Sequence, residues 1–385
     1  MEKKKIVEGI VKGLTGTVAL IVCAVGGYTI GKSGVISMHK QMSTGELLIY
    51  LGVLSIILFA AYFLQIVVHE TGHLVCGLCS GYTFTSFRIG SFMWIREQGK
   101  IKLSRYSLAG TGGQCLMAPP EMSEGKIPYV LYNLGGPLFN GLLALLAFIL
   151  YVPCRNIPYL QVCLLLVVLF GVVFGMLNGI PMKFGVPNDG YNAMTLGKDP
   201  EALRAFWVQM KVNAMLAEGV RIKDMPKEWF VIPSDEAMQN EMTSILGVLA
   251  CNRLVDCHEF AQAEELMTDL LQRDIRILDL YRSTLKEDCI YCELMGDGDR
   301  EKVEGWLDKG QQKYEKMMKR FPSVLRTQYT YALLAERDFK KAEEIEERFE
   351  NVACTYPYTN EIAGERELMK LADHRNQICP SNPFG

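Results

Sequence analysis

Residues 47–73 read Leu-Leu-Ile-Tyr-Leu-Gly-Val-Leu-Ser-Ile-Ile-Leu-Phe-Ala-Ala-Tyr-Phe-Leu-Gln-Ile-Val-Val-His-Glu-Thr-Gly-His, and the last five are His69-Glu70-Thr71-Gly72-His73. Before the first histidine, the only polar side chains apart from two tyrosines are Ser55 and Gln65. A helix of about 20 apolar residues crosses a bilayer, so this run predicts a membrane span. The span has a start signal, because Ser43-Thr-Gly-Glu46 has the spacing of a capping box.

The five residues that close this span have a metal-binding pattern. Histidines at i and i+4 project from one side of a helix, so His69 and His73 can reach one ion while Glu70 stands beside them. A catalytic zinc ion keeps a bound water of pKa about 7, and a nearby carboxylate can take its proton as the water attacks an amide. The pattern also arises by chance in soluble helices. At the end of a membrane span, where ionisable groups are costly and usually functional, it predicts a zinc peptidase.

Three more apolar stretches predict further spans, over residues 13–30, about 128–152 and about 159–177. Lysine and arginine are concentrated before the first span and between the second and the third. The positive-inside rule then places both termini and the histidine motif in the cytoplasm. We therefore predict a multi-pass protein of the cell membrane with about four spans.

Composition divides the chain into two parts. Apolar runs fill the sequence up to about residue 180, whereas most of the charge follows Asp199. This division predicts a membrane-embedded domain over residues 1–198 and a cytoplasmic domain over residues 199–385. The 40 basic and 43 acidic residues nearly balance, and no basic face interleaved with aromatic residues supports nucleic-acid binding.

The pattern becomes extended after the second predicted span. Residues 82–95 are rich in aromatic and β-branched side chains, residues 97–100 favour a turn, and residues 101–106 form a second strand. The segment predicts a small β-hairpin. It is either an ordinary folded loop or an edge beside the zinc that binds an extended peptide, which would suit a substrate helix that must unwind before its amides are attacked.

A third zinc ligand is needed, and Asp189 is the candidate. Two prolines and three glycines between Leu177 and Gly190 open the backbone after the last span and return Asp189 to the face where the histidines lie. Its carboxylate can complete the site, or it can serve an ordinary turn over residues 188–190. Earlier, Asn140 lies in the third predicted span, where it either reaches the reaction centre or ties helices together.

Three motifs in this order resemble the site-2 protease family of intramembrane zinc metalloproteases. They are His-Glu-Thr-Gly-His at 69–73, Gly-Gly-Pro-Leu-Phe-Asn at 135–140, and an Asn-x-x-Pro element from Asn178 followed by Asp189-Gly190. The resemblance covers residues 45 to about 195. It implies that His69, His73 and Asp189 hold zinc, that Glu70 activates water, and that Asn140 and Asn178 lie close to the substrate channel. The sequence departs from the family pattern in a longer segment before Asp189 and in Asn188, where the family has leucine.

The remainder of the chain has the periodicity of successive amphipathic helices. Residues 260–265 and 339–344 share an aromatic-x-x-Ala-Glu-Glu start, and the helices resemble tetratricopeptide repeats, whose concave surface binds peptides or proteins. A compact helical domain without a ligand is the alternative. The predicted helices cover residues 201–219, 233–254, 257–273, 277–295, 299–320, 323–336, 338–353 and 359–375.

Four cysteines in this region, Cys251, Cys257, Cys289 and Cys292, permit a second zinc site, but small thiols buried in helices are the more common outcome.

The sequence as a whole predicts a mainly α fold: a polytopic helical bundle with a small hairpin, followed by a cytoplasmic helical-repeat domain. The predicted function is zinc-dependent hydrolysis of transmembrane or membrane-associated proteins near the cytoplasmic face of the bilayer, with Glu70 as the base. The repeats would recognise substrate or a cytoplasmic partner. The alternative functions are a membrane-anchored scaffold with a non-catalytic zinc site and a membrane-anchored peptidase for soluble peptides.

Overall fold

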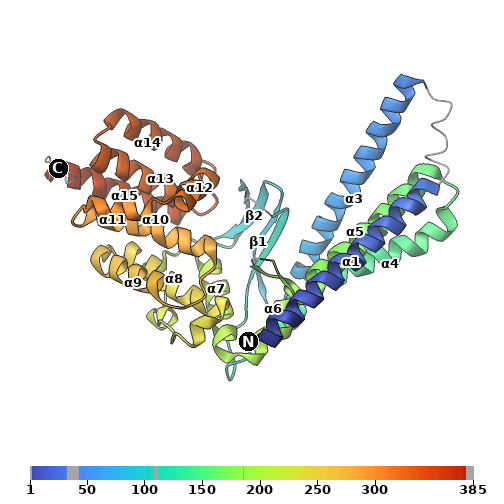
Figure 1. Ribbon diagram of the computed structural model, residues 1–385, viewed down its shortest axis with the longest axis horizontal. Helices are drawn as coiled ribbons and strands as arrows, with labels where there is room; N and C mark the ends of the chain where they lie inside the picture. Colours follow the sequence, from blue (N-terminus) through green and yellow to red (C-terminus); the bar gives the residue numbers. More distant parts are fainter. Residues whose placement is uncertain (1, 33–42, 108–110, 185, 379–385) are drawn as a thin grey trace. The chain divides into compact units, whose positions relative to one another are not determined.

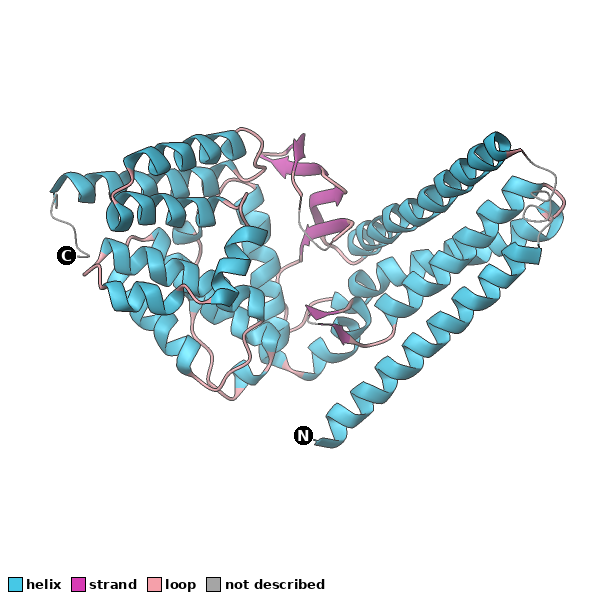
Figure 2. Ribbon diagram, turned by 45° about the horizontal axis from the view of Figure 1, so that its top comes forward, coloured by secondary structure: helices cyan, strands magenta, loops and turns pink. Residues whose placement is uncertain are grey.

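The computed structural model describes residues 2–32, 43–107, 111–184 and 186–378. The chain forms two compact units, one of Met1–Gly90 and Ala109–Lys198, the other of Ser91–Leu108 and Asp199–Gly385 (Figure 1). We call the first the membrane unit and the second the helical unit. Helices predominate in both (Figure 2), and the predicted mainly α fold class is confirmed. The helical unit also includes residues 91–108, which the sequence placed in the first domain.

Three helices of the membrane unit are long and apolar enough to cross a bilayer: α3 (Thr44–Cys79), α4 (Tyr129–Cys154) and α5 (Pro158–Gly179). In their most apolar windows only 11%, 17% and 28% of the residues are buried. Their apolar outer surfaces therefore need lipid around them. Helix α1 (Glu2–Lys32) covers the first predicted span, but its described apolar segment is shorter, so a fourth span stays a prediction.

Helix α3 begins where the capping box predicted. The Ser43 hydroxyl accepts a hydrogen bond from the Glu46 N–H (3.4 Å), and the Glu46 carboxylate accepts one from the Ser43 N–H (2.8 Å). Near its other end α3 packs tightly on α4, because a Cβ added at Gly72 would lie 2.2 Å from the Gly135 carbonyl oxygen. The two backbones touch beside the histidines, and any larger residue at this crossing would separate them.

A small antiparallel sheet has the strand order β3-β2-β1-β4 (magenta in Figure 2). The hairpin turn predicted at residues 97–100 is present, since Glu97 and Lys100 are paired. The strand expected over residues 82–95 is interrupted at Gly90, which has a φ of 58°. Strand β4 was not expected from the sequence. The bounds are β1 (Thr83–Ile89), β2 (Phe92–Glu97), β3 (Lys100–Arg105) and β4 (Gly113–Ala118).

The hairpin of β2 and β3 packs on helices of the helical unit. Met93 and Ile95 are 0% and 1% exposed and cluster with Ala217 of helix α7 (Pro200–Ala217). The carboxylate of Glu97 accepts a hydrogen bond of 3.1 Å from the hydroxyl of Thr359. These contacts make the hairpin part of the hydrophobic core of that unit.

The segment after α5 contains short elements that lead to the predicted third ligand. Strands β5 (Lys183–Phe184) and β6 (Val186–Pro187) form a two-stranded ribbon. Helix α6 (Asp189–Thr195) follows, and the 3-10 turn η2 (Leu196–Lys198) ends the unit. The departure from regular helix that the prolines and glycines predicted is therefore present.

The helical unit is a series of packed helices, among which α8 packs on α9, α9 on α10, and α13 on both α14 and α15. The two segments with the shared start open α9 and α14 and bury Ala263 and Ala342 at equivalent places. The tetratricopeptide-like character stays a prediction. The bounds are α8 (Glu241–Asp256), α9 (Phe260–Gln272), α10 (Asp279–Met295), α11 (Arg300–Trp306), α12 (Lys309–Met317), α13 (Pro322–Thr330) with its π-helical continuation η6 (Tyr331–Glu336), α14 (Phe339–Ala353) and α15 (Thr359–Ile378).

Two of the predicted helices have different limits in the structure. The helix expected from residue 233 begins at Glu241, because short 3-10 turns precede it: η3 (Ile222–Asp224), η4 (Lys227–Phe230) and η5 (Ala237–Gln239). The helix expected over residues 299–320 is two helices. The first ends at Trp306, and Asp308 caps the second by accepting a hydrogen bond from the Gln311 N–H (2.8 Å).

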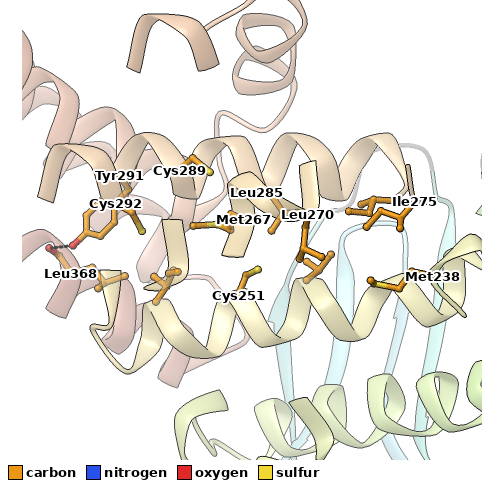
Figure 3. Packing of buried hydrophobic residues seen from close by; sticks show 14 residues of the cluster. Met238, Cys251, Met267, Leu270, Ile275, Leu285, Cys289, Tyr291, Cys292 and Leu368 are labelled. Atoms are coloured by element: carbon orange, nitrogen blue, oxygen red, sulfur yellow. Dashed lines mark hydrogen bonds between the residues drawn. The ribbon is translucent and has the colours of Figure 1, made fainter. Parts of the chain in front are cut away.

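One of the hydrophobic cores of the helical unit contains three of the four cysteines considered for a second zinc site. Cys251, Cys289 and Cys292 are at most 1% exposed and lie among apolar side chains such as Met267 and Leu285 (Figure 3). Burial raises the pKa of each of these thiols. In the described residues no group of metal-binding side chains includes them, so they pack as small apolar residues.

Candidate metal centre

The metal centre brings together side chains from two elements that are far apart in sequence. Helix α3 supplies His69 and His73, and the first residue of α6 supplies Asp189. The two histidine Nε2 atoms are 3.1 Å apart, and the Asp189 Oδ2 atom lies 3.2 Å from the first and 3.4 Å from the second. Among the described residues this is the one group of histidine, cysteine and acidic side chains positioned to hold a metal ion.

These three distances match what zinc requires. With ligand bonds of about 2.0–2.1 Å in a tetrahedron, neighbouring ligand atoms lie roughly 3.3 Å apart. Room for an ion is also present, because Gly136 of α4 faces the same point. A Cβ added at Gly136 would lie 2.5 Å from the His69 ring and 2.6 Å from the His73 Nε2 atom. The donor set and the space left by the missing side chain both fit a zinc ion.

Hydrogen bonds fix the orientation of both imidazole rings. The His69 Nδ1 atom lies 2.7 Å from the Asn140 Oδ1 atom, and the His73 Nδ1 atom lies 2.8 Å from the backbone carbonyl oxygen of Tyr132. Both partners are acceptors, so each ring carries its proton on Nδ1 and presents the Nε2 lone pair to the shared point. Neutral rings in this tautomer are the form that binds a metal.

A chain of amides holds Asn140 in the orientation that His69 needs. The Asn140 Nδ2 atom donates to the Gln65 side-chain oxygen (2.7 Å) and to the Gln65 carbonyl oxygen (2.9 Å). Gln65 in turn donates to the Val167 carbonyl oxygen of α5 (2.8 Å). Both amides are 0% exposed. Their polar atoms therefore connect α3, α4 and α5 behind the metal centre, where unpaired polar groups would be costly.

Asn188 positions Asp189. Its side-chain oxygen accepts hydrogen bonds from the N–H groups of Met182 (3.0 Å) and Tyr191 (2.9 Å), the second of which caps α6. Its amide nitrogen donates to the carbonyl oxygens of Leu177 and Ile180, each at 2.7 Å. One side chain thus closes the loop made by the longer segment. Because the Asn188 side chain makes the hydrogen bonds that stabilise the turn, the Asp189 carboxylate is left to face His69 and His73.

Glu70 lies beside the histidines and under the first residue of strand β4. Glu70 is only 8% exposed. A Cβ added at Gly113 would lie 2.6 Å from the Glu70 Cγ atom and 2.7 Å from its Oε1 atom. The backbone of β4 therefore passes directly over the carboxylate. Strand β4, which the sequence did not predict, is the strand next to the histidine motif.

The predicted site residues have different outcomes in the structure. It brings His69, His73 and Asp189 together and places Asn140 against His69. Asn178 instead donates to the Phe174 carbonyl oxygen of its own helix (3.1 Å), so a place beside the substrate stays a prediction for it.

Sequence reasoning missed Gly136 and Gln65, and it treated Asn188 only as a departure from a pattern. A signal existed for each. Gln65 is an amide in an apolar span, Gly136 is a glycine four residues before Asn140, and Asn188 is a strong capping residue directly before an acid.

The structure thus combines apolar helices long enough to cross a membrane with two histidines and a carboxylate that could hold a metal ion. The family model for peptidase family M50 matches residues 56–251, just over half of the chain, and the chain belongs to this family, that of the site-2 proteases. Membership implies an intramembrane metalloprotease, and M50 enzymes are in general zinc-dependent. No curated protein and no solved structure matches the sequence.

Proposed function

We propose that this M50 peptidase is a zinc endopeptidase that cuts transmembrane or membrane-associated proteins near the cytoplasmic face of the cell membrane. In this proposal His69, His73 and Asp189 hold the zinc ion, and Glu70 is the catalytic base. Both termini and the helical unit are cytoplasmic. The observation that carries the proposal is the convergence of three ligand atoms to within 3.1–3.4 Å of one another.

Each residue of the centre has a distinct task. A zinc ion held by His69, His73 and Asp189 would supply an activated water molecule, because zinc lowers the pKa of water to about 7. The Glu70 carboxylate accepts the proton of the attacking water and later delivers it to the leaving amide nitrogen. Asn140 and the Tyr132 carbonyl oxygen keep both rings in the metal-binding tautomer. The short distance between β4 and Glu70 excludes bulk water from one side of the base.

Strand β4 offers a way to present the substrate. A peptide bond inside a helix is protected by its i to i−4 hydrogen bonds, so a transmembrane substrate must be extended before attack. As an edge strand, β4 has backbone groups that can pair with an added strand. Because Gly113 lies over Glu70, a segment paired with β4 would pass the catalytic base. The helical unit would then recognise a more distant part of the substrate or a partner protein.

The experiment that tests this proposal compares membrane proteomes of cells that carry the wild type or Glu70→Gln. Loss of a general base slows a reaction by about 10²–10⁴-fold, so full-length substrates should accumulate in the variant. The purified variant should keep its zinc, since Glu70 is not a ligand. Identical proteomes would contradict the protease assignment and favour the membrane-anchored scaffold.

A further inference from the structure

The helical unit contains a cavity that the metalloprotease assignment does not explain. Its volume is about 360 Å³, and helices α7, α8, α10, α13 and α15 contribute to its wall. The charged side chains of the lining comprise four acids and two arginines, so the cavity has more negative than positive charge. They are Arg221, Asp256, Asp288, Arg326, Glu361 and Glu365.

Both arginines already have acidic partners. Arg221 pairs with Asp256 and with Glu367 outside the cavity. Arg326 pairs with the Asp288 Oδ1 atom at 2.6 Å and the Glu365 Oε2 atom at 2.9 Å. The positive charges are therefore balanced inside the wall. An anionic ligand would have to compete with these carboxylates, which makes the cavity a poor site for phosphate or an acidic peptide.

Glu361 is the acid of the lining that pairs with neither arginine. Its carboxylate accepts a hydrogen bond from the Tyr356 hydroxyl at 3.0 Å. Burial, assisted by the nearby Glu365, raises the pKa of Glu361 to about 7, although the hydrogen bond from Tyr356 lowers it. The protein thus keeps a carboxylate in surroundings that disfavour its charge. A bound cation would relieve that cost, and the rings of Tyr281 and Phe321 in the same wall can also contact a cation.

Two residues of the lining also have a buried side-chain polar atom without a hydrogen-bond partner. One of these atoms is the Nη1 atom of Arg326, a residue only 1% exposed whose guanidinium is held over the Tyr291 ring at 4.2 Å from its centroid. The other is the Oδ1 atom of Asn252. One is a donor and the other an acceptor, which are the partners that the C=O and N–H of a peptide group need.

We propose that this cavity binds a lysine or arginine side chain of an extended polypeptide segment, with Glu361 as the principal acid and Arg326 and Asn252 as partners of its backbone. We further infer that this segment is the basic flank of a substrate's membrane span. That second step rests on the proposed function. Membrane-spanning helices have an excess of lysine and arginine on their cytoplasmic side, so this class of substrate supplies the charge that the cavity lacks.

The test measures binding by full-length protein in detergent, with fluorescent peptides of one length in a Gly-Ser-Asn background. One peptide carries three lysines and the other three glutamates. The lysine peptide should bind and the glutamate peptide should not. Glu361→Gln, which keeps the side-chain size, should weaken binding of the lysine peptide by about tenfold. Glu343→Gln removes the same charge from the exposed face of α14 and should leave binding unchanged.

A second variant tests whether the open space of the cavity, and not only its charge, is needed for binding. Leu249→Trp would fill the space beside Asn252 without altering any ionisable group, and it should also abolish binding. Thermal unfolding of each variant shows that it is folded. Equal binding of both peptides, or undiminished binding by Glu361→Gln and Leu249→Trp, would overturn the proposal.

Failure here can be distinguished from failure of the protease assignment, because the binding measurement needs no catalysis. Glu70→Gln should bind the lysine peptide like the wild type. For a cleaved substrate, replacing its basic flank by serine should raise KM without lowering kcat in the wild type, and should change KM little in Glu361→Gln. Cleavage without any effect of the flank or of Glu361 would overturn the inference while the protease assignment stands. Binding without substrate accumulation in the Glu70→Gln cells would contradict its second step alone.

Discussion

The two units of the molecule both bury polar side chains, but the outer surface of one unit is apolar and that of the other is charged. In the membrane unit the outer faces of the helices are apolar, and the buried polar groups, such as Gln65 and Asn140, converge behind a metal centre. In the helical unit the core is apolar, the outside is charged, and buried charges such as Arg326 line a cavity. A buried polar residue can therefore be recognised from the sequence of an apolar helix, whereas the same residue type in a charged helix gives no such signal. Each prediction below perturbs one of these arrangements.

The largest expected effect is on the space for the metal. Gly136→Ala would place a methyl group 2.5–2.6 Å from ring atoms of both histidines, so we expect zinc binding to be abolished. Gly141→Ala on the same helix is the matched control, because a Cβ there meets no atom within 4 Å. Elemental analysis of the purified variants measures both. A Gly136→Ala protein with full zinc content would show that the ion lies elsewhere.

A smaller effect is expected from the amide that orients His69. Asn140→Leu removes the acceptor of the His69 Nδ1 proton, and loss of such a partner typically lowers metal affinity or activity by about 10–100-fold. Competition with a chelator measures the zinc affinity. If Asn140 only ties helices together, thermal stability will fall while zinc affinity stays at the wild-type value.

In the helical unit, the corresponding prediction concerns the buried acid Glu287. Its contribution to the stability of the unit depends on pH. Burial, assisted by the nearby Glu315, raises the pKa of Glu287 to about 8. Its side chain is paired with the Gln311 amide nitrogen at 2.6 Å. Because the folded-state pKa is above the unfolded value, the stabilisation is complete below about pH 4.5 and is lost as the pH rises through 8.

Between pH 5 and pH 8 the free energy of unfolding of the helical unit should therefore fall by about 3 kcal/mol from this group. Glu287→Gln should make the measured decline smaller by about this amount, whereas Glu343→Gln on the exposed face of α14 should leave it unchanged. Pulse proteolysis of the full-length protein in urea, in detergent, measures the difference. Parallel pH profiles for the wild type and Glu287→Gln would contradict the assigned pKa.

The sequence predicted those features that depend on residues close together in the chain. The relative placement of His69 and His73 depends on helical spacing within one turn, and the start of α3 depends on four adjacent residues, so both were accessible. The meeting of Asp189 with the histidines was inferred from topology and resemblance. The role of Gly136 depends on how α4 approaches α3, and its place four residues before Asn140 does not by itself give that approach.

The same reasoning explains the errors. Asn188 looked like a defect in a motif because its four hydrogen bonds reach residues on both sides of a loop whose path was unknown. Strand β4 was missed because its pairing with β1 is non-local and its segment begins with glycines. In the helical unit the helices were predicted well from periodicity, yet the cavity was not, since its charged lining comes from four helices and a loop residue without a shared motif.

The most direct test of the metal centre is the zinc content of purified wild type, His73→Ala and Asp189→Ala, with His374→Ala in the helical unit as a control. We expect approximately one zinc per chain in the wild type and the control. We expect loss of the metal in His73→Ala and Asp189→Ala. Full zinc content with unchanged affinity in Asp189→Ala would contradict the convergence of α3 and α6 around one ion.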